Sequence, residues 1–234
     1  MVLKKSPRPV KNLKQRNLIT KLKPKSPISE QYRTVRTNIQ FAEIDQELKS
    51  ILVTSTGPGE GKSTTVANLA VVFAQQGKRV LLVDADLRKP TVHFTFQISN
   101  IYGLTNVLTK LRSLDEAIAA TDIENLYVLT SGPIPPNPAE LLGSKAMREF
   151  ITTVEGEYDI ILFDTPPVLA VTDSQILANI CQGSLLVVSS GRTEIDMVTK
   201  AKDLLLSAKG KILGVVLNNK KVENSNYYYY YGVK

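Results

Sequence analysis

The 234-residue sequence contains very few of the residues that form disulfide bridges and zinc sites. Its single cysteine, Cys181, cannot form an internal disulfide bond, and its single histidine, His93, leaves no second imidazole for a histidine-rich metal site. No stretch approaches 18 consecutive apolar residues, and the first residues include no apolar segment of the signal-peptide type. We therefore expect a cytoplasmic protein with no membrane-spanning segment and no zinc chemistry.

Acidic residues are missing from the first 29 positions, whereas nine lysines and arginines lie there. Prolines interrupt this segment, a composition typical of a solvated and flexible polycation. The alternative interpretation is attachment to anionic lipid headgroups, which attract each nearby lysine or arginine by roughly 1 kcal/mol. Nucleic acid ranks below a membrane surface and is not expected as a partner, because the segment has no aromatic residue on which bases could stack.

The remaining sequence is nearly neutral and apolar enough for a sizeable core, since 43% of all residues are hydrophobic and 22% are charged. We expect one folded domain over residues 28–222. A basic flexible tail over 1–27 would precede it, and a flexible tyrosine-rich tail over 223–234 would follow it.

Short apolar runs rich in branched side chains predict buried strands. They occupy 51–53, 80–83, 126–129, 160–163, 185–188 and 212–217. Helical patterns occupy about 29–44, 62–76, 104–120, 139–154, 173–181 and 194–209, and Ser29 is the expected N-cap of the first of them. The alternation predicts an α/β fold, in which helices cover both faces of a mostly parallel central sheet.

The segment 54–64, with the sequence TSTGPGEGKST, lies between the first predicted strand and the next helix and resembles a P-loop. In such a turn, backbone N–H groups converge on phosphate oxygens at a helix N-terminus. Lys62 would reach the β- and γ-phosphates of a nucleotide, and Ser63 would supply a hydroxyl group to Mg²⁺. Thr56 replaces the usual first glycine, and Gly57 follows one position later. The pattern predicts a P-loop NTPase fold that binds ATP and Mg²⁺.

Carboxylates follow two of the predicted strands. Asp84 and Asp86 come after the strand over 80–83, and Asp164 ends the strand over 160–163 in a pattern that resembles a Walker B motif. Each alone is compatible with a turn or a helix cap. Because ligands of open parallel sheets bind at the carboxyl ends of the strands, the three together predict a magnesium site beside the P-loop.

The segment 84–88 (DADLR) resembles the second Walker-type motif of the bacterial tyrosine kinase (BY-kinase) family, the cytoplasmic kinases of capsule and exopolysaccharide synthesis. The resemblance extends over about 28–231. Its other elements are Glu30-x-x-Arg33-x-x-Arg36, PPNPAELL at 135–142, DTPP at 164–167 and the tyrosines at 227–231. The rival class, the partition-type ATPases, has a signature lysine where this sequence has Gly57.

The resemblance implies a role for each matching residue. Nucleotide binding would involve Gly57, Gly59, Glu60, Gly61, Lys62, Ser63, Thr64 and Asn218. The metal shell would comprise Ser63, Asp86 and Asp164, and the catalytic group would comprise Lys62, Asp84, Asp86 and Arg88. A carboxylate can accept the phenolic proton late in a loose phosphoryl transfer. We favour Asp84 as this base, although the sequence does not decide between Asp84 and Asp86.

The resemblance also implies partners. Glu30, Arg33 and Arg36 would join subunits into a ring, an octamer in the family, although a solvated helix face is the alternative. Neighbouring subunits would then phosphorylate Tyr227, Tyr228, Tyr229, Tyr230 and Tyr231. A separate membrane protein would activate the kinase through its cytoplasmic tail and recruit it, together with the basic tail, to the inner face of the membrane. Further substrates would be proteins of polysaccharide synthesis. A switch ATPase that transfers phosphate only to water is the rival function.

Overall fold

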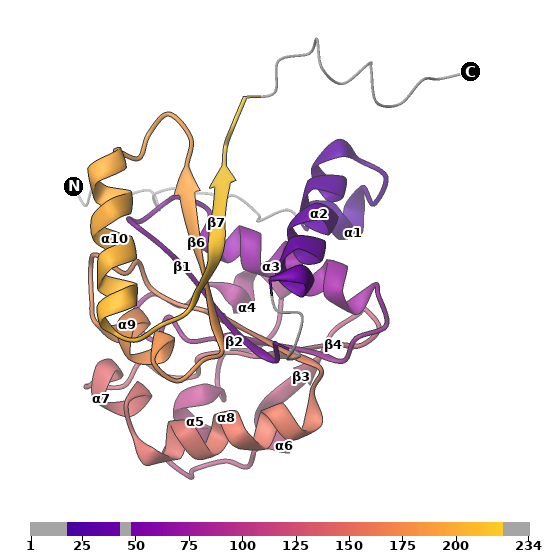
Figure 1. Ribbon diagram of the computed structural model, residues 1–234. Helices are drawn as coiled ribbons and strands as arrows, with labels where there is room; N and C mark the ends of the chain where they lie inside the picture. The colour runs from indigo at the N-terminus through magenta and orange to yellow at the C-terminus, as the bar shows by residue number, and fades with distance from the viewer. Residues whose placement is uncertain (1–17, 43–47, 222–234) are drawn as a thin grey trace, which may run out of the picture.

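The structure is a computed structural model that describes residues 18–42 and 48–221. Helices cover both faces of a central sheet (Figure 1). Within the described residues the sheet has seven strands in the order β3-β4-β2-β5-β1-β6-β7. The β3–β4 pair is antiparallel and the other neighbouring strands are parallel. The predicted α/β class is therefore confirmed.

The bounds of the elements agree with all six predicted strands. The strands are β1 (Ser50–Ser55), β2 (Val80–Asp84), β3 (Ile118–Ala120), β4 (Leu126–Leu129), β5 (Ile160–Asp164), β6 (Gly183–Ser189) and β7 (Ile212–Asn218). The helices are α1 (Ile19–Leu22), α2 (Pro27–Phe41), α3 (Lys62–Ala74), α4 (Val92–Phe96), α5 (Leu104–Leu108), α6 (Leu114–Ala117), α7 (Pro138–Leu142), α8 (Lys145–Glu157), α9 (Asp173–Ala178) and α10 (Ile195–Ser207). In these described ranges no helix combines the length and the apolar character needed to cross a membrane.

The sheet separates two hydrophobic cores because successive side chains of a strand point to opposite faces. In β1, Ile51 and Val53 pack with α3, whereas Leu52 packs with the helices of the other face. The helix α3 is apolar on nearly all sides because the sheet covers one side of it and α1 and α2 cover another (Figure 1).

The parallel register brings the predicted acidic residues together. The strand β5 lies between β1 and β2, and all three run in the same direction. Asp164 of β5 is paired in register with Asp84 of β2 on one side and with Val53 of β1 on the other. The three strands therefore end at the same edge, where the turn into α3 begins.

The predicted boundary between a tail over 1–27 and the folded domain is wrong for residues 18–27. Leu18 and Thr20 are buried against α3, and both the amide N–H and the hydroxyl of Thr20 donate to Asn68 Oδ1, at 3.0 and 2.8 Å. The start of the next helix is also corrected. Its N-cap is Ser26, whose hydroxyl accepts the Ser29 N–H at 3.2 Å, because Pro27 suits the first helical position.

Two predicted long helices are each interrupted. The pattern over 104–120 forms α5, a turn with Lys110 at φ 59°, α6 with its cap at Ser113, and the antiparallel strand β3. The pattern over 139–154 forms α7 and α8, because Ser144 caps a new helix by accepting the Met147 N–H. The prediction missed α1 and α4, and the helix expected over 173–181 ends at Ala178. The last predicted strand, β7, is an edge strand and only partly buried.

The docking of α1 yields a stability prediction. Asn68→Ala removes the carboxamide that accepts two hydrogen bonds from buried Thr20, so we expect the free energy of unfolding to fall by about 1–3 kcal/mol. Thr199→Ala, which removes an exposed hydroxyl bound to the Ile195 carbonyl, should change it by less than about 0.5 kcal/mol. Urea unfolding of both variants measures the difference. Equal stabilities would show that α1 is not part of the cooperative fold.

Candidate functional site

The predicted P-loop is a tight turn between β1 and α3. Gly59 and Gly61 have φ angles of 80° and 91°, a region that favours glycine. At Gly61 space is limiting as well, since an added Cβ would lie 2.1 Å from Asn218 Nδ2. The turn therefore carries backbone N–H groups to the N-terminus of α3, where the helix dipole attracts anions.

Glu60 fixes the shape of this turn from within. Its buried carboxylate accepts hydrogen bonds from the Thr56 N–H at 2.8 Å, the Thr56 hydroxyl at 2.6 Å, the Gly57 N–H at 3.1 Å and the Thr193 hydroxyl. Its backbone carbonyl accepts from Asn218 Nδ2 at 2.8 Å. The carboxylate thus binds the backbone N–H groups of Thr56, which replaces the usual first glycine, and of Gly57. It also links the turn to the β6–α10 loop through Thr193.

Lys62 brings the predicted metal-binding residues together. Its ammonium nitrogen lies 3.2 Å from Asp86 Oδ2, 3.2 Å from Asp164 Oδ1 and 3.1 Å from Ser63 Oγ. Burial alone would lower the pKa of Lys62, but the charges of Asp164 and Asp86 and their hydrogen bonds raise it above its ordinary value. The lysine is therefore cationic and positioned at the start of α3.

Asp84 is completely buried next to this group. Its Oδ2 accepts the N–H groups of Thr91 and Val92, both at 2.9 Å, and so anchors the start of α4. Its Oδ1 has no hydrogen-bond partner within the described part of the chain. Burial, and then the charge of Asp164, raise the pKa of Asp84 to about 7, although the two N–H groups and Lys62 act in the opposite direction.

Arg88, predicted as catalytic, lies in a bidentate pair with Asp173. Arg88 Nε donates to Oδ2 and Nη2 donates to Oδ1, both at 2.9 Å, and Asp173 is fully buried at the first position of α9. The structure therefore gives Arg88 the role of fixing the β2–α4 loop to α9. Sequence analysis missed Asp173, whose only local signal is an acidic residue in a first helical turn.

The oxygen atoms around Lys62 suit Mg²⁺. Asp164 Oδ2 is buried and, within the described residues, has no partner. Residues 18–42 and 48–221 contain no group of three or more His, Cys, Asp or Glu side chains that could hold a metal ion by itself. Mg²⁺ uses few carboxylates and completes its shell with phosphate oxygens and water.

A cavity of about 340 Å³ opens beside the turn. The turn itself, from Thr56 to Glu60, forms one wall, and residues of the β6–α10 loop and the start of α10 form the other, including Arg192, Thr193 and Met197. Asn218, predicted to take part in nucleotide binding, donates to the Glu60 carbonyl and is not among the residues that line this cavity.

The residues predicted for assembly divide into two groups. Arg33 pairs with Glu30 on the surface of α2 and donates to the Pro24 carbonyl at 2.7 Å. Arg36 donates to the Val72 carbonyl at 2.7 Å and thus joins α2 to α3, so both arginines form bonds within their own subunit. The predicted phosphorylation sites Tyr227–Tyr231 lie outside the described residues.

Similarity to known proteins agrees with this geometry. A family model described as an AAA domain matches residues 48–192. The tyrosine-protein kinase YwqD of Bacillus subtilis (strain 168) is 58% identical over 220 residues, which cover 94% of this chain and 93% of the relative. The chain belongs to the bacterial tyrosine kinase family. The predicted enzyme class, a protein-tyrosine kinase, is thereby confirmed.

Solved structures of this family superpose over most of the chain. The chimerical protein CapA2B2 has a TM-score of 0.85 at 46% identity and covers 88% of this chain and 90% of its own. The kinase domain of the Escherichia coli tyrosine kinase ETK has a TM-score of 0.83 at 31% identity, with coverages of 89% and 84%.

A more distant structural relative has been solved with a bound nucleotide. The septum site-determining protein MinD of Pyrococcus horikoshii OT3, in complex with Mg-ADP, has a TM-score of 0.62 at 29% identity and covers 72% of this chain and 69% of its own. The predicted P-loop NTPase fold is confirmed, and that relative binds its nucleotide with Mg²⁺.

The raised pKa of Asp84 predicts a pH-dependent stability. Between about pH 4 and pH 7 the folded protein retains a proton that the unfolded chain has released, so stability falls as the pH rises through this range. We expect this carboxyl to lower the free energy of unfolding by about 1–3 kcal/mol between pH 5 and pH 8, and Asp84→Asn to remove that decrease. Urea unfolding at both pH values measures it. The exposed Asp203→Asn variant should retain the full decrease, and an Asp84→Asn protein that also retains it would contradict the assignment.

Proposed function

We propose that this kinase transfers the γ-phosphoryl group of ATP to the tyrosines at 227–231 of a neighbouring copy and to other proteins that control capsule or exopolysaccharide production. The observation that supports this most strongly is the position of the Lys62 ammonium group, between Asp86 and Asp164 at the N-terminus of α3. One cation and several carboxylates at a phosphate-binding turn are the parts that phosphoryl transfer needs.

In this proposal the turn binds the nucleotide and orients it. The N–H groups from Gly59 to Thr64 would cradle the phosphates, and Lys62 would stabilise negative charge on the phosphoryl oxygens. Ser63, Asp86 and Asp164 would hold Mg²⁺ directly or through water. The bound ATP with its Mg²⁺ supplies the phosphoryl group. Arg88 and Glu60 would keep the two flanking loops in place through Asp173 and Thr193.

Asp84 would accept the tyrosine proton. A pKa of about 7 suits a general base at neutral pH, because about half of the carboxyl groups are ionised there and the ionised form binds a proton well. Its Oδ2 is held by two N–H groups, so the phenolic hydroxyl would donate to Oδ1, the oxygen that has no partner among the described residues. Asp86, which contacts Lys62 directly, is better placed for the metal.

The proposal includes two kinds of partner. A separate membrane protein would activate the kinase and recruit it to the inner face of the membrane, an idea supported by the similarity to the chimerical protein CapA2B2. Further copies of the chain would form a ring through Glu30 and Arg33, which lie on the surface of α2. The basic segment at the N-terminus would add attraction to anionic lipids.

The kinase is tested with labelled ATP and the purified full chain. We expect acid-stable phosphate on Tyr227–Tyr231 in the wild type and at least a hundredfold less in Lys62→Met, which lacks the cation at the phosphates. Lys62→Met also leaves Asp86 and Asp164 without their counter-charge and should be less stable, so Asp86→Asn serves as a second variant. Mass spectrometry locates the phosphate.

The exposed Lys202→Met variant on α10 is the control and should keep full activity. Wild-type protein that releases inorganic phosphate but labels no tyrosine would favour the switch ATPase, a function suggested by the likeness to MinD. Undiminished labelling in both Lys62→Met and Asp86→Asn would place the site elsewhere.

Assembly yields a separate prediction. If Arg33 joins subunits, Arg33→Ala should give small particles and weak tail phosphorylation, and its loss of stability should not exceed that of the bond to the Pro24 carbonyl, about 0.5–1.5 kcal/mol. Arg36→Ala should also lower the free energy of unfolding, because its guanidinium binds the Val72 carbonyl within the subunit. Light scattering of tail-dephosphorylated protein measures particle size. Arg33→Ala particles as large as those of the wild type would contradict the assigned interface.

A further inference from the structure

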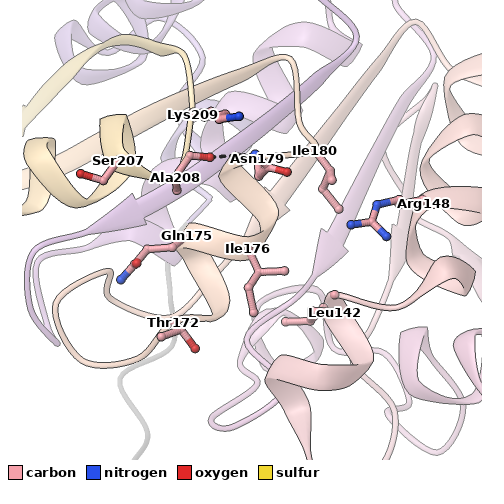
Figure 2. Close-up of a pocket in the computed structure, with 11 residues that line it drawn as sticks. Leu142, Arg148, Thr172, Gln175, Ile176, Asn179, Ile180, Ser207, Ala208 and Lys209 are labelled. Carbon is pink, nitrogen blue, oxygen red and sulfur yellow. Dashed lines mark hydrogen bonds between the residues drawn. The ribbon is translucent and has the colours of Figure 1, made fainter.

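A second cavity, of about 570 Å³, lies beside α7, α8, α9 and α10 (Figure 2). It is bounded by the ends of α7 and α10 and by the outer sides of α8 and α9. Lys209 lies between the end of α10 and the start of β7, which places the cavity near the amino ends of the strands. The phosphate-binding turn, by contrast, follows the carboxyl end of β1.

The cavity combines an apolar surface with positive charge. Ile176 and Ile180 present partly exposed aliphatic side chains to it, and the Arg148 guanidinium points into the same space (Figure 2). Lys209 adds a second cation at the rim, and the lining includes no aspartate or glutamate. Within the described residues, neither of these two cations forms an ion pair or a side-chain hydrogen bond.

The walls of the cavity are fixed. Asn179 Nδ2 of the segment after α9 donates to the Ala208 carbonyl after α10 at 2.9 Å (Figure 2). Leu142 is completely buried at the end of α7, where it joins the core of this face. The cavity is thus a preformed concave surface within the usual size range of ligand sites, about 300–1,000 Å³.

We propose that this cavity binds phosphorylated side chains of the segment Tyr227–Tyr231, from the same chain or from a second copy. An aromatic ring fits against the aliphatic wall, and its phosphate group, which carries a charge of about −1.5 to −2, pairs with Arg148, whereas Lys209 attracts the phosphate of a neighbouring tyrosine. The proposal rests on the proposed function, because the kinase must first phosphorylate this segment.

The charge distribution favours this occupant over the unmodified segment. Asp84, Asp86 and Asp164 make the catalytic edge acidic, so a phosphorylated tyrosine is repelled from the place where it forms. The cavity has the opposite charge and no acidic lining residue. The negative charge of the added phosphate would therefore both drive the phosphotyrosine out of the catalytic site and attract it to the cavity.

The length of the chain permits the contact. The described strand β7 carries the chain from the cavity side to the catalytic edge over seven residues, or about 23 Å. From Lys221, the ten residues to Tyr231 span up to about 35 Å when extended. The later tyrosines of the same chain can thus reach back along the length of β7 to the cavity. The segment of a second copy does not start from this Lys221, so this distance does not limit it.

Binding of synthetic peptides tests the proposal without any kinase reaction. The full chain, treated with phosphatase and free of nucleotide, is titrated with three peptides covering 222–234. One carries phosphotyrosine at all five positions, one carries tyrosine, and one has glutamate in place of every tyrosine. Fluorescence anisotropy gives the affinities, and NMR shifts of the Ile176 and Ile180 methyl groups report the place of binding.

We expect the phosphorylated peptide to bind at least tenfold more tightly than the other two and to shift both isoleucine signals. Arg148→Gln combined with Lys209→Gln should lower its affinity at least tenfold. The matched control, Lys145→Gln combined with Lys202→Gln, removes the same two charges from exposed positions of α8 and α10 outside the cavity and should change the affinity less than twofold. All four positions are exposed, so thermal melts should remain unchanged.

The other outcomes overturn the proposal. Equal losses in the two double variants would indicate attraction to overall charge rather than a site. Equal binding of the glutamate peptide would assign the cavity to acidic segments of a partner protein, and equal binding of the tyrosine peptide would remove any role for phosphate. Because the peptides carry their phosphate from synthesis, a chain that cannot phosphorylate itself affects none of these results.

Discussion

The contact of the Lys62 ammonium group with Asp86 and Asp164 is the interaction on which the site depends. Three carboxylates meet at one edge of the sheet, and two of them, Asp84 and Asp164, have no exposed surface. Their mutual repulsion would protonate or separate them in the absence of a cation. The lysine limits this repulsion, and Asp84, which it does not contact directly, has the raised pKa. The arrangement therefore places the carboxyl group that we propose as the base beside the two carboxylates that we propose as metal ligands.

This arrangement follows from the order of the strands. Because β5 lies between β1 and β2 and runs parallel to both, the residues after three separate segments meet at one edge. Asp84 and Asp164 are paired in register, so their separation is set by the sheet and not by a flexible loop. The two cores then hold the strands rigidly, since Leu52 and Val53 are fully buried on opposite faces.

The sequence was sufficient for six of the seven described strands, the turn and the three aspartates, because apolar runs and short motifs are local signals. It was insufficient for side chains whose partners lie far away in the sequence. The Arg88–Asp173 pair spans 85 positions, and the bonds from Glu60 to Thr193 and Asn218 span 133 and 158. The predictions of two helix starts failed for a related reason. Several nearby residues could have capped these helices, and packing selects Ser26 and Ser144 among them.

These distant bonds also connect the phosphate-binding turn to the segment that we propose the kinase phosphorylates. Asn218, the last residue of β7, donates to the Glu60 carbonyl, and Asn219 donates to Ser189 at the end of β6. The chain therefore leaves the sheet at the phosphate-binding turn itself. The segment that follows is attached at the rim of its own acidic site, where added phosphate raises repulsion without any large movement of the domain. Glu60 thus joins the end of β7, from which this segment continues, to the phosphate-binding turn.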